Sequence, residues 1–306
     1  MEGYSTPILF IIFNRLDTSL RVFEEIRKQK PKKLYIAADG PRKNNSNDIE
    51  NCKKTREIIN KIDWSCDLKT LFRDENLGCG RAVSGAINWF FENEEMGIIL
   101  EDDCLPHEDF FGYCEQLLVK YKDKDSIKLI TGDNFQKGNT RGDASYYFSA
   151  YSHIWGWASW SRVWRDYDFS MSNINKNDFV IAMKSYGFSA KEREIWLDKY
   201  ELLKKNRIDT WDYQFSFSIW KNRGLNIIPN SNLISNIGFG ESSTHTKDKK
   251  NPLSNLPTQP ILPLTHPEKI EINRLADDFF YDYFWHKKIV NLVYRRLRRM
   301  LLSKKV

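Results

Sequence analysis

Three consecutive acids, Glu101, Asp102 and Asp103, directly follow the short apolar run 98–100. The run is too short to cross a membrane and predicts a buried strand, which should end by Pro106 because proline cannot continue a hydrogen-bonded ladder. Ligands of open α/β sheets bind at the carboxyl ends of strands. Buried acids there need cations or hydrogen bonds, and a divalent metal that bridges to a substrate diphosphate would satisfy them. The alternative is a solvated acidic turn that closes a core strand.

A further acid, Asp212, stands at the start of the apolar segment 213–220, which predicts a helix. A carboxylate in this position can act as a general base that removes a proton from a hydroxyl group. It can also serve only to interact with the positive N-terminal end of the helix. The residues by themselves leave both interpretations open.

The segment 76–81, Asn-Leu-Gly-Cys-Gly-Arg, precedes a run whose apolar residues fall on one helical face. The N-terminus of such a helix suits an anionic group such as a phosphate. The glycine spacing matches neither a P-loop nor the G-x-G-x-x-G motif of dinucleotide-binding folds. The glycines therefore indicate either an anion site or only a turn.

Strands and helices alternate along the first half of the chain, and these elements must position the acids. Strands are predicted at residues 7–13, 34–38, 66–72, 98–100, 127–130, 227–230 and 233–237. Segments with apolar residues at helical spacing separate the first of them. This β-α-β-α-β order predicts an α/β fold with a mostly parallel central sheet, flanked by helices and joined by right-handed crossovers.

The composition is that of a globular protein rich in aromatic side chains. Its 306 residues are 41% hydrophobic, which allows one large or two small domains. The Trp, Tyr and Phe content disfavours disorder and suits a sugar-binding surface. The segment 151–160 places three Trp around a glycine, which can build either a core or a site. Five Cys at irregular spacing, with no signal peptide, predict a cytoplasmic protein.

Basic residues gather at the end of the chain. From His286 to Val306 there are eight Lys or Arg and no acid; without these eight, the 47 bases fall to 39 against 41 acids, a net charge of −2. The excess of bases therefore belongs to a tail and not to a nucleic-acid-binding body. Apolar and basic residues of 288–301 fall mostly on opposite helical faces, which predicts an amphipathic helix on an anionic membrane surface. The alternative is a helix that packs on the protein itself.

Several of these segments, in this order, resemble the motifs of GT-A-fold (Rossmann-like) glycosyltransferases, and specifically those of the N-acetylglucosaminyltransferase I group and its bacterial relatives. The resemblance extends roughly from residue 7 to residue 246. The segment 12–15 resembles the end of the family's first strand, and 100–103 resembles its DXD-equivalent motif. The resemblance implies that a nucleotide sugar is bound by Asn14, Arg15, Asp39, Arg81, Glu101 and Asp102.

The same resemblance implies roles for the other candidate residues. Asp103 and His245 would be ligands of Mn²⁺ or Mg²⁺, although the spacer before His245 is longer than in the family. Asp212 would be the catalytic base. The acceptor side would be shaped by Trp155, Trp157 and Trp211.

The function that the resemblance implies is the metal-dependent, inverting transfer of a hexosyl or N-acetylhexosaminyl group. The donor would be a nucleotide sugar, with UDP as the expected nucleotide. The acceptor would be a hydroxyl of a glycan or of a lipid-linked molecule, as in polysaccharide biosynthesis. One alternative is a sugar nucleotidylyltransferase, which carries a glycine-rich loop after its first strand where residues 13–17 have no glycine. The other is a non-catalytic carbohydrate-binding protein.

The chain divides into three parts on this interpretation. Residues 1–246 form the GT-A domain, in which 1–105 bind the nucleotide sugar and 106–246 the acceptor. Residues 247–270 hold half of the ten prolines and predict an extended arm. Residues 271–306 form the basic amphipathic helical tail, which would place the protein peripherally on the inner face of the cell membrane.

Overall fold

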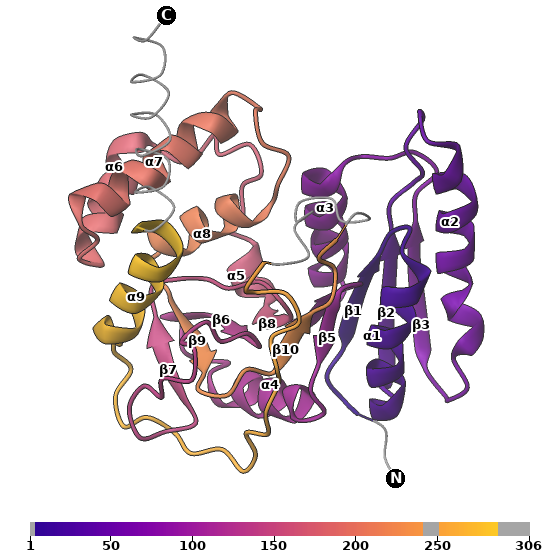
Figure 1. The fold of residues 1–306 in the computed structure, drawn as a ribbon, viewed down its shortest axis with the longest axis horizontal. Coiled ribbons are helices and arrows are strands. Elements are labelled where there is room, and N and C mark those ends of the chain that lie inside the picture. The colour runs from indigo at the N-terminus through magenta and orange to yellow at the C-terminus, as the bar shows by residue number, and fades with distance from the viewer. Residues whose placement is uncertain (1–3, 241–250, 287–306) are drawn as a thin grey trace, which may run out of the picture.

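The computed structural model describes residues 4–240 and 251–286, which form an α/β fold around one large sheet (Figure 1). Its strands are β1 Ile8–Ile12, β2 Lys33–Ala38, β3 Asp67–Phe72, β4 Met96–Glu101, β6 Ile127–Thr131, β7 Tyr146–Ser149, β8 Trp157–Trp160 and β9 Leu225–Pro229. They lie side by side in the order β3-β2-β1-β4-β8-β6-β9-β7. Only β7 and β8 run antiparallel to the other strands of this sheet.

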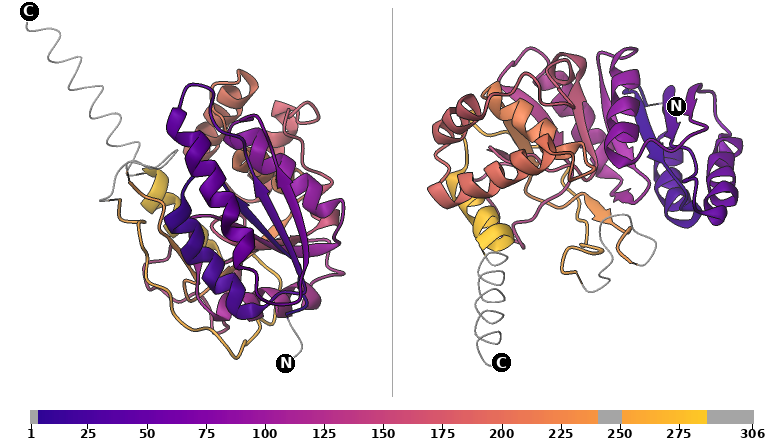
Figure 2. Two further views of the ribbon diagram at one scale, coloured as in Figure 1. Left: turned by 90° about the vertical axis from the view of Figure 1, so that its right-hand side faces the viewer. Right: turned by 90° about the horizontal axis from the view of Figure 1, so that it is seen from above.

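Helices flank the sheet along its whole length. They are α1 Leu16–Gln29, α2 Ser46–Arg56, α3 Cys79–Phe91, α4 Asp109–Lys120, α5 Ser161–Trp164, α6 Lys176–Ser185, α7 Ala190–Lys204, α8 Asp212–Lys221 and α9 Arg274–Tyr281. The view from above shows α1 and α2 at one end of the molecule and α6 to α9 at the other (Figure 2). The predicted fold class, a mostly parallel sheet flanked by helices, is confirmed.

The apolar pattern of the sequence explains the first strands and helices. Every residue of β1 is buried, as expected for a parallel strand covered on both faces. Helix α1 buries Val22, Phe23 and Ile26, which recur at helical spacing and therefore share the face toward the sheet. Helix α2 ends at Arg56, and a 3₁₀ turn, Glu57–Lys61, follows it.

The strand that carries the acidic triplet ends at Glu101, before the predicted limit at Pro106. A turn at 102–103 separates it from the short strand β5, Cys104–Pro106. Strand β5 pairs antiparallel with β10, Ile234–Asn236, in a separate sheet of two strands. Pro106 instead closes this second strand, where as a last residue it does not interrupt a ladder.

The described part of the predicted arm, 251–270, is fastened to the body. The backbone N–H groups of Ile261 and Leu262 both donate to the carboxylate of Asp109, at 2.7 and 3.1 Å. The hydroxyl of Tyr146 lies 2.9 Å from Nδ1 of His266. These contacts hold the arm against the large sheet and against α4.

Helix α9, at the start of the predicted tail, also packs on the body. Its Asp277 is 3% exposed and accepts hydrogen bonds from Ser149 Oγ at 2.5 Å and from the Ala150 N–H at 3.0 Å. The described helices include none that is long and apolar enough to cross a membrane. Residues 288–301, for which the amphipathic helix was predicted, lie outside the described residues.

Candidate active site

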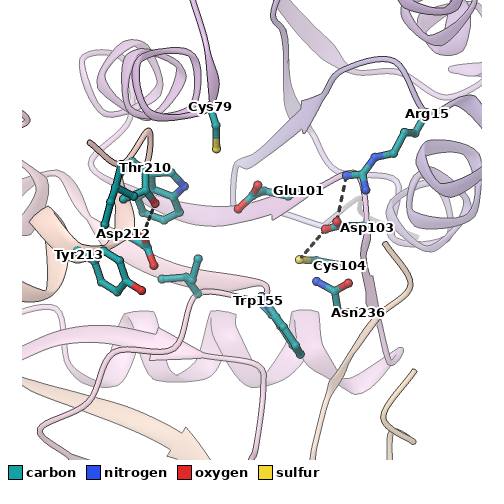
Figure 3. Close-up of a pocket in the computed structure, with 13 residues that line it drawn as sticks. Arg15, Cys79, Glu101, Asp103, Cys104, Trp155, Thr210, Asp212, Tyr213 and Asn236 are labelled. Atoms are coloured by element: carbon teal, nitrogen blue, oxygen red, sulfur yellow. Dashed lines mark hydrogen bonds and ion pairs between the residues drawn. The ribbon is translucent and has the colours of Figure 1, made fainter. Parts of the chain in front are cut away.

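A cavity of about 350 Å³ lies between the carboxyl end of β4 and the start of α8. Its wall is formed by Arg15, Cys79, Glu101, Asp103, Cys104, Ile154, Trp155, Ile208, Thr210, Trp211, Asp212, Tyr213 and Asn236. Glu101 and Asp212 point into the same space from opposite sides, with Asp103 and Arg15 farther along one wall (Figure 3). The cavity thus brings together acids that are more than 100 positions apart in the sequence.

The turn after β4 gives the three acids different surroundings. Asp102 does not line the cavity, is 3% exposed, and accepts hydrogen bonds from the Phe13 N–H at 3.3 Å and from Arg15. Arg15 Nη2 also lies 3.0 Å from Asp103 Oδ2, so one guanidinium bridges Asp102 and Asp103. Glu101 and Asp103 are the two acids of the triplet that line the cavity.

The charge balance of the cavity favours a cation. Burial, together with the neighbouring charges of Asp103 and Asp102, raises the pKa of Glu101 to about 8, although the charge of Arg15 lowers it. A carboxyl group that is hard to ionise for these reasons becomes easier to ionise when a positive charge binds beside it. Arg15 is already shared between Asp102 and Asp103, so it leaves this demand unmet.

The residues fit part of a divalent metal site. Carboxylate oxygens are the donors that Mg²⁺ prefers, and such an ion commonly takes one or two carboxylates together with substrate phosphates. Within residues 4–240 and 251–286, no group of three or more His, Cys, Asp or Glu is placed to hold a metal. Asp103 and Glu101 can therefore supply only part of the ligand set, which a diphosphate would have to complete. The other predicted ligand, His245, lies outside the described residues.

The segment that leads toward His245 is fixed beside Asp103. The Ile237 N–H donates to the Asp103 carbonyl at 2.9 Å, and the Gly238 N–H donates to Asn236 Oδ1 at 3.0 Å. A Cβ atom on Gly238 would lie 2.1 Å from Asp103 Oδ2, so only glycine allows this close approach of backbone and carboxylate. The last described residues before the segment 241–250 therefore pass beside Asp103, a predicted metal ligand.

Asp212 occupies the first position of α8, and its carboxylate faces the cavity (Figure 3). Thr210 Oγ1 donates a hydrogen bond to Asp212 Oδ1. Its position in the first turn fits the helix-end interpretation, and its place in the cavity wall fits the base interpretation. The same carboxylate can serve both purposes.

Asp209 holds the segment before Asp212 in place, a role that no pattern in the sequence indicates. Its carboxylate accepts hydrogen bonds from the N–H groups of Cys79 and Gly80, at 2.9 and 2.8 Å, at the N-terminus of α3. Added Cβ atoms on Gly78 and Gly80 would lie 2.6 and 2.8 Å from the same carboxylate. The anion predicted for this helix N-terminus is therefore a side chain of the protein itself. The glycines make room for it.

Besides Asp102, three more predicted nucleotide-binding residues lie outside the cavity wall and have other partners. Asn14 Nδ2 donates to Asp48 at 2.8 Å. Asp39 accepts hydrogen bonds from Asn76 Nδ2 at 2.8 Å and from the Leu77 N–H, and burial raises its pKa. Arg81 places its guanidinium 5.1 Å from the centre of the Phe169 ring. The structure thus brings Arg15, Glu101 and Asp103 together, and leaves Asn14, Asp39 and Arg81 in separate contacts around them.

The three tryptophans predicted for the acceptor side differ in position. Trp155 is partly exposed in the cavity wall, and Trp211 lines the cavity although it is only 2% exposed. Trp157 is completely buried, with its ring stacked 5.8 Å from that of Trp211. Trp157 is therefore a core residue beneath the cavity, with no surface that could contact an acceptor. Its position corrects the sequence-based prediction for this residue.

Alanine substitutions of Trp157 and Trp155 should have different effects, because one residue is in the core and the other in the cavity wall. We expect Trp157→Ala to lower the free energy of unfolding by about 3–5 kcal/mol, because it leaves a large hole in the core. Trp155→Ala should cost much less stability and should instead weaken ligand binding in the cavity. Denaturant unfolding of both variants measures the first effect. Equal loss of stability in the two would contradict the assignment of Trp155 to the cavity wall.

Comparisons with known proteins give weak similarities. No family model matches the chain, and no curated protein matches it. Among solved structures, it is similar to residues 1–349 of S. aureus TarS, with 11% identity and a TM-score of 0.38 over 54% of this chain and 49% of that one. It is also similar to HddC from Yersinia pseudotuberculosis (11% identity, TM-score 0.33, 53% of this chain and 80% of that one) and to a UDP-glucose pyrophosphorylase complexed with UDP-glucose (12%, 0.31, 53% and 78%). The chain spans about half of the TarS structure, and similarities this low do not assign a function.

Proposed function

We propose that this protein is a metal-dependent glycosyltransferase that moves a sugar from a nucleotide donor to a hydroxyl group by direct displacement. The observation that carries the proposal is the cavity itself, with Glu101 and Asp103 on one wall and Asp212 facing them. A cation held by these acids would neutralise the negative charge of a diphosphate leaving group. A separate carboxylate opposite them suits removal of the acceptor proton.

The residues then have the following roles. A Mn²⁺ or Mg²⁺ ion, when bound, would neutralise the charge that develops on the departing diphosphate. Asp103 and Glu101 would hold it, and Arg15 would keep Asp103 oriented through their 3.0 Å contact. Asp212 would accept the proton of the acceptor hydroxyl as the hydroxyl oxygen bonds to the anomeric carbon and the bond from that carbon to the diphosphate breaks. A single displacement of this kind inverts the anomeric carbon.

The turn between β1 and α1 supports sugar transfer over nucleotidyl transfer. Only residues 13–15 connect the two elements, and Arg15 in this turn is bound to the acids of the triplet. So short a connection leaves no glycine-rich loop to surround a nucleoside triphosphate.

The donor nucleotide, which we expect to be UDP, and the glycan or lipid-linked acceptor belong to the same proposal. An anionic membrane surface for the tail belongs to it as well.

The proposal is tested by offering the purified protein a set of nucleotide sugars with and without Mn²⁺ or Mg²⁺. A bound donor should raise the melting temperature by mass action, and it should do so only when the metal is present. Addition of acceptor glycans should then release the nucleoside diphosphate. Release of pyrophosphate from a nucleoside triphosphate and a sugar phosphate would instead identify a nucleotidylyltransferase. Stable binding of a glycan without turnover of any donor would identify a carbohydrate-binding protein.

A further inference from the structure

A second cavity, of about 440 Å³, lies at the amino ends of β6 and β9. Because these strands run parallel to β4, it opens at the edge of the sheet opposite the candidate active site. Its wall is formed by Asp125, Ser126, Lys128, Arg162, Arg165, Asp166, Asn222 and Arg223. Four bases face two acids in this lining, so the cavity carries an excess of positive charge.

Lys128 is the residue whose environment calls for a ligand. It is 8% exposed, and burial lowers the pKa of its ammonium group. Nowhere in the described part of the chain does the Lys128 side chain have a hydrogen-bond or ion-pair partner. The charges that act on it come from Asp166, Arg162 and Asp125, which all line the cavity, so the ammonium end faces this space.

The local backbone is shaped to hold Lys128 in this position. A Cβ atom on Gly224 would lie 2.1 Å from Lys128 Cγ, so the lysine stem crosses directly over a residue that has no side chain. Gly224 lies between Arg223 and the first residue of β9. The stem is thus fixed by packing against Gly224, which holds the ammonium group at its end beside the cavity.

Arg162 is held rigidly beside it. Its Nε donates to the Lys122 carbonyl at 3.1 Å, one of its terminal nitrogens donates to the Ile127 carbonyl at 3.2 Å, and the guanidinium lies 4.5 Å from the centre of the Trp160 ring. These bonds satisfy the carbonyl groups after α4, which is a structural role. The other terminal nitrogen, Nη1, is buried without a hydrogen bond and lies 3.9 Å from the largely exposed Asp125 carboxylate.

A structural role therefore explains Arg162 but does not explain Lys128. The Lys128 ammonium group stands among three other bases and two acids in the cavity wall, and among the described residues it forms an ion pair with neither acid. The nearest acids are poor partners, since the Asp125 side chain is 95% exposed and Asp166 lies on the surface. An anion in the cavity would give the ammonium group the partner that the protein does not provide.

We propose that this cavity binds an oxyanion of the phosphate class, either the free ion or the phosphoryl group of a larger molecule. Lys128 would contact it from the cavity wall, and Arg165 and Arg223 from the exposed rim. Each oxygen of such an anion accepts charge-assisted hydrogen bonds of the kind that ammonium and guanidinium groups donate. The site is independent of the sugar transfer proposed above, because it lies at the other edge of the sheet.

Titration calorimetry and thermal unfolding with sodium phosphate, compared with sodium chloride at equal ionic strength, test the proposal. We expect one saturable phosphate site and a rise in melting temperature that chloride does not produce. A parallel titration with glycerol 3-phosphate distinguishes free phosphate from the phosphoryl group of a larger molecule. Tighter binding of this ester than of the free ion would indicate the phosphoryl group of a larger molecule, and the reverse would indicate the free ion.

Lys128→Met retains the length of the side chain and removes the charge. We expect it to weaken phosphate binding at least about 10-fold, the effect of losing one charge-assisted hydrogen bond. It should leave the melting temperature without phosphate nearly unchanged, because methionine keeps the stem that packs on Gly224. Replacing a lysine with a purely structural role would instead lower that temperature. The matched control is Lys191→Met, at an exposed lysine of α7 outside the cavity, which should alter neither property.

Arg165→Gln provides a second variant at an exposed position, where misfolding is not expected. It should weaken phosphate binding several-fold and leave the melting temperature without phosphate unchanged. Phosphate binding that is no tighter than chloride binding in the unsubstituted protein would overturn the proposal. So would full retention of binding in both variants.

Discussion

Replacing Asp212 with Asn should reduce sugar transfer by about 10²-fold or more while donor binding stays within a few-fold of that of the unsubstituted protein. The amide has nearly the same shape as the carboxylate and can still accept the hydrogen bond from Thr210. It cannot take a proton from an acceptor hydroxyl. Single-turnover transfer measures the chemical step, and calorimetry with a nucleotide sugar measures binding.

A matched control separates loss of the base from a change at a helix end. Asp178 stands in the first turn of α6, as Asp212 does in α8, but lies outside the cavity wall. Asp178→Asn should cost a similar small amount of helix stability and leave transfer unchanged. If Asp212→Asn also transfers sugar at nearly the normal rate, Asp212 only interacts with its helix and another residue must be the base.

Asp103→Ala should abolish the divalent dependence of nucleotide-sugar binding. Asp103 is the acid of the triplet that both lines the cavity and contacts Arg15, and only Glu101 would remain as a carboxylate ligand on that wall. Calorimetry with a UDP sugar, with and without Mn²⁺, measures the effect. Glu108→Ala, at an exposed acid that precedes α4, is the control and should bind as the unsubstituted protein does. Unchanged affinity with unchanged metal dependence in Asp103→Ala would remove Asp103 from the site.

The raised pKa of Glu101 gives the metal affinity a defined pH dependence. A carboxyl group must lose its proton to bind a metal ion. Since the pKa of Glu101 without a metal is about 8, affinity should rise as the pH increases from about 7 to 9, and binding at pH 7 should release a proton. Glu101→Gln should remove this rise. An affinity that is constant over the same range would show that Glu101 does not contact the ion.

The sequence predicted the fold well where local patterns determine structure. The continuous apolar run at β1 matches a strand buried on both faces, and the spacing of Phe23 and Ile26 matches a helix on the sheet. The pattern did not predict β5, because three residues pair with a segment about 130 positions later. It also did not predict that α9 packs on the body through Asp277, since a buried acid in an amphipathic segment appears polar in the sequence.

The candidate site was predictable only where a local pattern determines the position of a residue. An acidic triplet directly after an apolar run places Glu101 and Asp103 at a strand end, and the structure puts both in the cavity wall. Trp155 and Trp157 could not be distinguished, because two residues of one type around a glycine have the same local pattern. Asp209 could not be recognised, since its partners, Cys79 and Gly80, are separated from it by about 130 residues.

The contact between Asp209 and α3 has a consequence for synthesis on the ribosome. Domains fold as the chain emerges, from the N-terminus onward. The strands β1 to β4 can pair early, but the N-terminus of α3 receives its carboxylate only after residue 209 has left the exit tunnel. Until then the acidic triplet faces solvent without its opposite wall. The nascent chain therefore carries half of the cavity while about a third of its residues, those between Asp103 and Asp212, are added, and the cavity is complete only when α8 closes the other side.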